Sequence, residues 1–567
     1  GDHRDLHSFP TRRSSDLALI GIIVWVVRQK QNDSADYFLG GRDATWLAIG
    51  ASIFASNIGS EHLIGLAGAG ASSGMAMAHW EIQGWMILIL GWVFVPFYTR
   101  SMVYTMPEFL ERRYNPQSRT ILSVISLVSY VLTKVAVTVY AGGLVFQQVF
   151  GIKELWGIDF FWIAAIGLVV LTALYTIFGG MKSVLYTSVL QTPILLLGSL
   201  IILVLGFKEL GGWDEMMRVC GAVTVNDYGD TMTNLIRSND DANFPWLGAL
   251  IGSAIIGFWY WCTDQFIVQR VLSGKNEMEA RRGTIFGAYL KLLPVFLFLI
   301  PGMIAFALHQ KYIGAGGEGF LPMLENGTAN ADAAFPTLVA KLLPAGVKGL
   351  VVCGILAALM SSLASLFNSS AMLFTIDFYK RFRPQTSEKK LVGIGQVATV
   401  VIVILGILWI PIMRSVGDVL YTYLQDVQSV LAPGIAAAFL LGICWKRTSA
   451  QGGMWGLISG MVIGLTRLGA KVYYSNAGEV ADSTFKYLFY DMNWLFFCGW
   501  MFLFCIIVVI VVSLATEAPT AEKIQGLVFG TATKEQKAST RASWNHWDII
   551  HTVIILAITG AFYWYFW

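Results

Sequence analysis

Long apolar segments dominate the pattern of hydrophobic and polar positions along this chain. Each is close to the length of about 20 residues that crosses the hydrocarbon core of a bilayer, and short polar connections separate them. They lie at 46–70, 75–98, 120–148, 159–178, 183–207, 245–269, 284–308, 346–376, 391–413, 417–442, 451–470, 494–515 and 547–567. This pattern predicts an all-α polytopic membrane protein in which the polar stretches are loops and no soluble domain is present.

The N-terminal residues depart from this pattern. Residues 1–16 are polar and lack the apolar core of a signal peptide, and we interpret them as a non-native or artefactual leader. The apolar stretch within 17–28 is too short to cross a bilayer. We interpret it as the end of a truncated first transmembrane helix, which brings the expected number of spans to about fourteen.

Ten of the spans divide into two sets of five, 46–207 and 245–442. The first span of each set is interrupted by polar residues, Ser-Asn-Ile-Gly at 56–59 and Tyr-Trp-Cys-Thr-Asp at 260–264. Interrupted spans in corresponding positions of two halves indicate an inverted-repeat transporter with its binding site at the interruptions. We therefore predict two inverted five-helix repeats, followed by three C-terminal transmembrane helices within 451–567.

Composition and charge support a membrane protein and give its orientation. Hydrophobic residues make up 56% of the chain and charged residues 13%, about half the charged fraction of a typical soluble domain. The loops at 99–119, 270–283, 377–390 and 516–546 carry most of the Lys and Arg found in loops. These loops are therefore expected in the cytoplasm, and the protein in the cell (plasma or inner) membrane as a multi-pass protein.

The sequence offers little support for other classes of function. It contains no phosphate-binding glycine loop, no metal-spaced His/Cys cluster, and no nucleophile with a recognisable partner, so we do not expect an enzyme. The net charge of +3 gives no indication of nucleic-acid binding.

A first group of embedded polar groups offers oxygen ligands only. The interruption near Ala55 and Ile58 releases backbone carbonyls, and Ser361 and Ser362 lie in a span of small residues with Ala358. A hard monovalent cation prefers such oxygens. The two serines taken alone favour close helix packing over ion binding, so both interpretations stand at this point.

A second group mixes hydrogen-bond donors, acceptors and aromatic faces. Its members are Asn57, His62, Trp80, Glu81, Tyr260, Trp261, Lys291, Gln425 and Gln428. A sugar needs a partner for each hydroxyl, since an unpaired buried polar group costs roughly 1–3 kcal/mol, and an aromatic ring covers its apolar face. Glu81 and Lys291 are equally compatible with a structural ion pair, Lys134 with snorkelling or pairing, and Glu61 has no assigned role.

Five motifs in these spans are long and specific. They are Gly-Ala-Ser-Ile-Phe-Ala-Ser-Asn-Ile-Gly-Ser-Glu-His at 50–62, Trp-Tyr-Trp-Cys-Thr-Asp-Gln-Phe-Ile-Val-Gln-Arg at 259–270, Gly-Ala-Tyr-Leu-Lys-Leu-Leu-Pro at 287–294, the serine-rich stretch 356–370, and Phe-Leu-Leu-Gly-Ile-Cys-Trp-Lys-Arg at 439–447. Through them the chain closely resembles the sodium/glucose cotransporters of the solute:sodium symporter family, from Leu19 to Trp567. The resemblance implies a leucine-transporter-type fold with two inverted five-helix repeats and flanking helices.

The resemblance also implies roles for the two groups. The sodium site would comprise the carbonyls of Ala55, Ile58 and Ala358 and the hydroxyls of Ser361 and Ser362. The sugar site would comprise Asn57, His62, Glu81, Lys291 and Gln425, with Trp261 lining it and Tyr260 as the inner gate beneath the sugar.

Three positions depart from the family pattern. Gly257 stands where relatives place a polar Thr or Asn near the sugar, so one sugar contact is expected to be missing. Ser188 replaces an Asp near a proposed second ion site, and Ala364 replaces a Thr found in members that carry two sodium ions. We therefore predict one sodium per sugar.

Together these features predict a secondary active transporter that couples inward sodium flow to uptake of a hexose, glucose or galactose, by alternating access. Its partners would be the sugar, the co-transported sodium ion and the lipid bilayer. Two alternatives remain: sodium-coupled transport of myo-inositol or another polyol, and a sensor that binds sugar without moving it.

Overall fold

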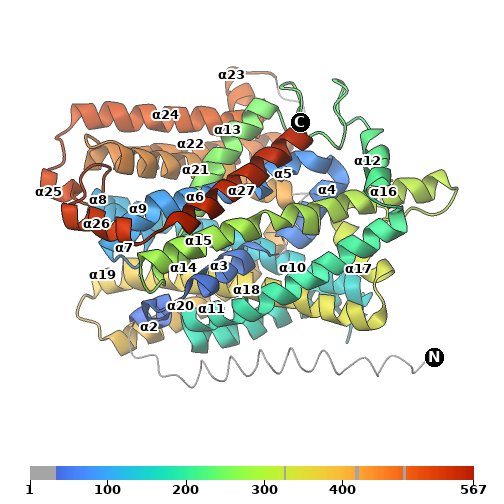
Figure 1. The fold of residues 1–567 in the computed structure, drawn as a ribbon, viewed down its shortest axis with the longest axis horizontal. Coiled ribbons are helices and arrows are strands. Elements are labelled where there is room, and N and C mark those ends of the chain that lie inside the picture. Colours follow the sequence, from blue (N-terminus) through green and yellow to red (C-terminus); the bar gives the residue numbers. More distant parts are fainter. Residues whose placement is uncertain (1–33, 60, 325–326, 415–419, 477–480) are drawn as a thin grey trace.

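The computed structural model describes residues 34–567 except 60, 325–326, 415–419 and 477–480. The expected leader and truncated first helix, 1–16 and 17–28, lie outside the described residues. The described chain is almost wholly helical (Figure 1). Its one sheet among these residues is a short hairpin of β1 (Glu154–Leu155) and β2 (Ile158–Asp159).

The helices of the first half precede residue 222. They are α2 (Ser34–Leu39), η2 (Gly40–Arg42), α3 (Trp46–Asn57), η3 (Glu61–Leu66), α4 (Ala67–Ser73), η4 (Gly74–Met77), α5 (Ala78–Glu81), α6 (Gly84–Ile89), η5 (Leu90–Phe94), α7 (Val95–Ser101), α8 (Met106–Arg113), α9 (Pro116–Ser129), η6 (Tyr130–Val135), α10 (Ala136–Phe150), α11 (Phe160–Leu210) and α12 (Trp213–Gly221). The helical path of α11 is broken at Gly180, whose φ of 54° favours glycine. The expected spans 159–178 and 183–207 therefore lie on either side of this residue.

The remaining helices follow the polar stretch after α12. They are α13 (Trp246–Gly257), η7 (Phe258–Thr263), α14 (Gln265–Leu272), α15 (Glu277–Lys291), η8 (Val295–Leu299), α16 (Ile300–Gly314), η9 (Ala331–Ala333), α17 (Ala334–Leu342), α18 (Ala345–Met372), η10 (Leu373–Tyr379), α19 (Lys380–Phe382), α20 (Glu388–Arg414), α21 (Leu420–Cys444), α22 (Ala450–Asn476), α23 (Thr484–Lys486), η11 (Tyr487–Asp491), α24 (Trp494–Ala515), α25 (Ala521–Ile524), α26 (Lys534–Ala542) and α27 (His546–Tyr565).

Nine helices of the described residues are long and apolar enough to cross a bilayer. Three expected spans contribute shorter apolar helices, Trp46–Asn57, Val137–Gln147 and Phe160–Leu174. The expected span 451–470 lies in α22, which is long but is not among the nine. The expected polytopic helical character is therefore present.

Both expected interruptions are present. Helix α3 ends at Asn57, Ile58 is extended with ψ of 96°, and the π-helix η3 begins at Glu61. In the second half, the π-helix η7 ends before Asp264, which is also extended and accepts a hydrogen bond from the backbone N–H of Phe266 at 3.2 Å, capping α14. Irregular backbone of this kind is tolerated at membrane depth where protein or a polar cavity surrounds it.

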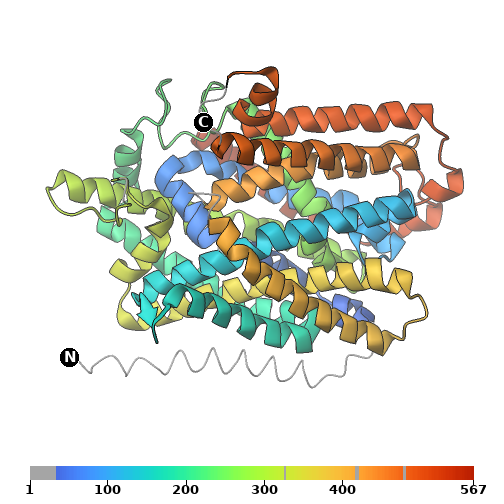
Figure 2. The ribbon, with the colours of Figure 1, turned by 180° about the vertical axis from the view of Figure 1, so that it is seen from behind.

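The interrupted helices lie inside the bundle. Helix α3 packs against α15, α11 and α18, and α18 packs against α11. Helices α21, α22 and α24 pack together along one edge, and α27 packs across α6 and α15 (Figure 1). From behind, α10, α11 and α20 lie side by side (Figure 2).

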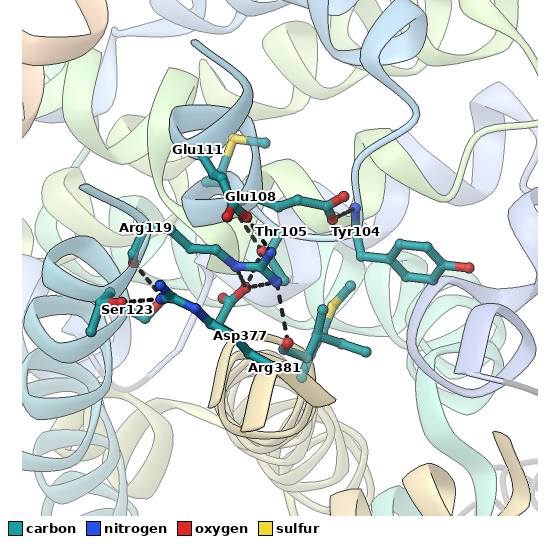
Figure 3. Close-up of polar contacts among 12 residues, drawn as sticks. Tyr104, Thr105, Glu108, Glu111, Arg119, Ser123, Asp377 and Arg381 are labelled. Atoms are coloured by element: carbon teal, nitrogen blue, oxygen red, sulfur yellow. Dashed lines mark hydrogen bonds and ion pairs between the residues drawn. The ribbon is translucent and has the colours of Figure 1, made fainter. Parts of the chain in front are cut away.

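Two of the loops expected in the cytoplasm meet in a polar network (Figure 3). Arg119 of α9 forms ion pairs with Asp377 of η10 and with Glu111 of α8, both at 2.6 Å. The Thr105 hydroxyl also donates to Asp377, at 2.9 Å. The loop 99–119 is therefore fixed to the end of the span that precedes loop 377–390.

The other two loops join the same face. Arg100 donates to Thr540 at 2.5 Å, and the Ser543 hydroxyl donates to Glu277 at 3.2 Å. Lys523 donates to the carbonyl of Glu111 at 3.3 Å. The four basic loops thus lie at one end of the molecule, as a single cytoplasmic face requires.

Helices α4 and α16 approach each other through glycine. A Cβ on Gly302 would lie 2.8 Å from the carbonyl carbon of Ala67, and one on Gly70 would lie 3.1 Å from that of Leu299. Backbone atoms cannot move aside as a flexible side chain can, so small residues are required where two helices pack this closely.

We predict that Gly302→Ala lowers the melting temperature, because overpacking against backbone costs about 1–3 kcal/mol. Gly314→Ala on the same helix is the matched control, since a Cβ there meets nothing within 4 Å. The measurement is thermal unfolding of purified protein in detergent. Equal melting temperatures for the two variants would contradict the close approach of α4 and α16.

Candidate functional site

A polar cavity lies where the two interrupted segments meet. From the first half of the chain, its walls include the end of α3, η3, α5 and the link that follows α5. From the second half they include the ends of α13 and α15, together with η7 and α21. The centre of a water molecule can occupy about 60 Å³ of this cavity. That is room for on the order of five water molecules. The cavity is therefore suited to a small polar solute.

The structure brings all seven residues expected to bind the sugar to this cavity. Asn57, His62, Glu81, Tyr260, Trp261, Lys291 and Gln425 all line it. Trp80 and Gln428, from the same group of embedded polar and aromatic residues, line it as well, and so does Glu61. These residues come from five separate segments of the chain, and only the fold places them together.

Two charged residues of the cavity wall, Glu81 and Lys291, form an ion pair. Lys291 Nζ lies 2.5 Å from Glu81 Oε2, and His62 Nε2 lies 3.2 Å from the same oxygen. The Lys291 ammonium also lies 5.3 Å from the centre of the Trp261 ring. Buried charges need such partners, and Glu81 and Lys291 together add no net charge to the wall.

His62 connects this pair to the interruption in α3. The Asn57 Nδ2 and His62 Nε2 atoms lie 3.3 Å apart. A ring nitrogen carries either a proton or a lone pair, so Nε2 cannot donate to Glu81 and accept from the Asn57 amide at the same time. The orientation of Asn57 is thus coupled to the proton on His62.

Four polar atoms of cavity-lining residues have no hydrogen-bond partner within the described chain. They are Glu61 Oε2, His62 Nδ1, Trp80 Nε1 and Gln425 Oε1, and each is buried. Buried polar atoms are almost always hydrogen-bonded in proteins. These four atoms are therefore free to form hydrogen bonds with a polar solute in the cavity.

Gln83 is a cavity residue that sequence reasoning missed. Its Nε2 donates to the carbonyl of Ser253 at 2.7 Å, and its carboxamide lies directly against Gly257. A Cβ on Gly257 would lie 2.9 Å from the Gln83 Cδ. We expected Gly257 to leave the cavity without a polar contact at this point, but the Gln83 amide fills the space beside it.

No periodicity in the sequence indicates this placement. Helix α5 ends at Glu81, and Ile82 and Gln83 both have ψ near 22–24°, outside the helical range. This turn redirects Gln83 toward the cavity although it lies only two positions after Glu81. The interruption is short and carries no Pro that would have marked it.

A second buried ion pair lies next to Tyr260. Lys134 of η6 pairs with Asp264, which also accepts a hydrogen bond from the Tyr130 hydroxyl. The Lys134 ammonium lies 4.7 Å from the centres of the Tyr260 and Phe266 rings. Lys134 therefore pairs with a carboxylate rather than snorkelling, and it holds η6 against the interrupted segment of the second half.

The five groups expected to bind sodium lie at the junction of α3 and α18, and all are buried. They are Ala55, Ile58, Ala358, Ser361 and Ser362. The hydroxyls of Ser56 and Ser365 lie 2.7 Å apart and join the two helices. The last carbonyls of an α-helix have no partner within that helix, so the carbonyls from Ala55 onward are available for other contacts.

Ser362 lies beside the interruption itself. A Cβ on Gly59 would lie 3.0 Å from Ser362 Oγ. Ser361 Oγ lies 3.2 Å from Ser188 Oγ. Hydroxyl groups of α3 and α18 therefore meet close to the interruption.

Comparison with known proteins gives a consistent result. The profile of a family described as the sodium:solute symporter family matches residues 37–460. The human sodium/myo-inositol cotransporter 2 is 37% identical over 529 residues, covering 91% of this chain and 77% of that protein. The dog sodium/myo-inositol cotransporter is 36% identical over 548 residues, covering 91% and 75%.

A solved structure shows the same fold. The substrate-bound, outward-open structure of a Na⁺-coupled sialic acid symporter matches with a TM-score of 0.70 and 22% identity, covering 90% of this chain and 98% of that one. The described chain therefore has the leucine-transporter-type architecture that was expected, and it is a multi-pass membrane protein.

We predict that Gly257→Ala destabilises the protein by about 1–3 kcal/mol, because the added methyl group collides with the Gln83 carboxamide. In a double-mutant cycle, Gln83→Ala should remove most of this loss, since contacting residues are not additive. Thermal unfolding of the four proteins measures the coupling. If the double variant loses as much stability as the two single variants together, Gln83 and Gly257 do not share this space.

Proposed function

The chain belongs to the sodium:solute symporter family, and we propose that it couples inward sodium flow to uptake of a neutral cyclic polyol, with myo-inositol as the first candidate. Sodium is the co-transported ion, as in the family as a whole. The choice of solute and the binding role of each residue are our proposal.

The observation that supports a polyol is the chemistry of the cavity. Two of its charged residues, Glu81 and Lys291, are paired and contribute no net charge to the wall, so a neutral solute fits beside them. Both donors and acceptors line it, including the unpartnered Trp80 Nε1, His62 Nδ1 and Gln425 Oε1. A ring that carries hydroxyl groups on every side can form hydrogen bonds with these atoms. Each buried polar group that gains a partner avoids a desolvation penalty of roughly 1–3 kcal/mol.

The relatives favour myo-inositol over the hexose that the sequence suggested. Two proteins at 36–37% identity over 91% of this chain are named sodium/myo-inositol cotransporters. A hexose remains the second candidate, because a pyranose also presents ring hydroxyls and its apolar face suits the buried Trp261 ring. A sensor that only binds the solute is the least supported, since the family is one of symporters.

In this proposal sodium binds the carbonyls of Ala55, Ile58 and Ala358 and the hydroxyls of Ser361 and Ser362. One sodium per solute follows from two neighbouring positions. The Ser188 hydroxyl donates within its own helix, to the carbonyl of Val184 at 2.6 Å. Ala364 is buried and has no side-chain oxygen.

Transport proceeds by alternating access. Sodium holds the interrupted α3 in a shape that completes the outward-facing pocket through Asn57 and His62, and Tyr260 separates the solute from the inner side. One charge crossing roughly 100 mV supplies about 2.3 kcal/mol, and a tenfold sodium gradient adds about 1.4 kcal/mol. Together they sustain roughly a 500-fold solute gradient.

We predict that proteoliposomes take up labelled myo-inositol only with an inward sodium gradient. Equal uptake when potassium replaces sodium would overturn the coupling. Competition by unlabelled glucose ranks the two candidate solutes. If glucose is taken up with the higher kcat/KM, the hexose becomes the first candidate.

We predict that two substitutions separate the solute site from the sodium site. Glu81→Gln removes the charge that holds Lys291 and His62, and it should raise the solute KM at least tenfold. Ser362→Ala should instead raise the sodium concentration for half-maximal uptake. Ser459→Ala, which removes hydrogen bonds to the Gly456 carbonyl within α22 and to Cys505 Sγ of α24, is the control, because Ser459 lies outside both sites.

These variants also test whether the ion pair is purely structural. If Glu81→Gln prevents folding, or lowers the melting temperature without changing the solute KM, Glu81 and Lys291 serve to hold helices together. Size-exclusion chromatography and thermal unfolding of each variant give this result.

A further inference from the structure

Glu61 is an acidic residue of the cavity wall that neither candidate site includes. It is the first residue of η3, immediately after the interruption in α3. It lines the solute cavity, while its Oε2 is buried and has no hydrogen-bond partner in the described part of the chain. A buried carboxylate oxygen in this state is costly unless something binds it.

The unpartnered oxygen of Glu61 lies on the side of the interruption where we propose that sodium binds. A methyl group built on Gly59 would place its carbon 2.7 Å from Glu61 Oε2 and 3.0 Å from Ser362 Oγ. Both oxygens therefore border the same small space, beside the last residues of the interrupted helix. Ser362 is one of the hydroxyls proposed to bind sodium.

The other acids of this region already have cationic partners. Glu81 is bound by Lys291 and His62, and Asp264 is bound by Lys134. The carbonyls and hydroxyls proposed for the sodium site are all neutral. A desolvated cation among neutral oxygens gains most from the nearest uncommitted carboxylate, because charges interact strongly where water is excluded.

We propose that the Glu61 carboxylate binds the co-transported cation and is part of the sodium site, an inference that rests on the proposed sodium coupling. Its ligand is a small monovalent cation, held by Oε2 together with Ser362 Oγ. The same side chain borders the solute cavity, and the next residue, His62, contacts Glu81. Adjacent residues of one segment therefore contact the ion and the solute.

The test compares Glu61→Gln with wild type in sodium-driven uptake of myo-inositol. Glu61→Gln keeps the shape and removes the charge, so the sodium concentration for half-maximal uptake should rise at least tenfold. The solute KM at saturating sodium should stay within about twofold. Glu209→Gln, on α11 with its carboxylate bonded to the Tyr312 hydroxyl at 3.0 Å, is the matched control.

Each other outcome has a distinct meaning. Wild-type uptake that runs equally in potassium overturns the proposed coupling itself. If uptake by the wild type depends on sodium and Glu61→Gln has the same sodium requirement, only the role of Glu61 is overturned. If Glu61→Gln raises the solute KM at saturating sodium, Glu61 binds the solute. If it lowers the melting temperature and leaves the sodium requirement unchanged, Glu61 has a structural role. Both results overturn the inference.

A second measurement uses the wild-type protein and does not depend on the variant folding. Dicyclohexylcarbodiimide reacts with buried carboxyl groups, and peptide mass spectrometry locates the product. We expect labelling at Glu61 in potassium and at least fivefold less in sodium, with sodium leaving any labelling at Glu81 unchanged. Equal labelling of Glu61 in the two salts, or none in either, contradicts the inference.

Discussion

The interruption of α3 between Asn57 and Glu61 is the constraint on which the rest of the structure depends. A helix that stops inside a membrane leaves backbone groups without partners, and lipid cannot supply them. The bundle therefore surrounds this point with helices that include α18 and α21. The polar groups that protect the broken backbone also form the cavity, so the stability of the fold and the binding chemistry rest on the same few residues.

Two buried ion pairs join the halves of the molecule near this point. Glu81–Lys291 lies in the cavity wall, and Lys134–Asp264 lies beside Tyr260. Each joins a helix of the first half to a helix of the second. Removing one partner of a buried pair costs about 3–5 kcal/mol, so any opening movement that separates such a pair must supply new partners. In our proposal this requirement restricts the protein to a few well-defined states during transport.

The sequence predicted the fold class, and it singled out the seven residues that line the cavity because polar residues inside apolar spans are rare and conspicuous. Asn57, Glu81 and Lys291 are visible in this way, and the family resemblance assigned them together. Gln83 was not predicted, because its position depends on a turn after α5 that leaves no signal in the pattern. The approach of both Glu61 Oε2 and Ser362 Oγ to Gly59 could not be predicted either, since it depends on the packing of α3 against α18. The preference for myo-inositol came from relatives, because glucose and myo-inositol require nearly the same wall.

The central claim is that one interrupted helix serves both the cation and the solute. Binding of either ligand must then raise the affinity for the other by the same factor, because coupling between two sites is reciprocal. Equilibrium calorimetry on the purified protein measures this directly: myo-inositol affinity with and without sodium, and sodium affinity with and without myo-inositol. We predict that both affinities increase, and by equal factors of about five or more. Solute binding that is independent of sodium would contradict the account.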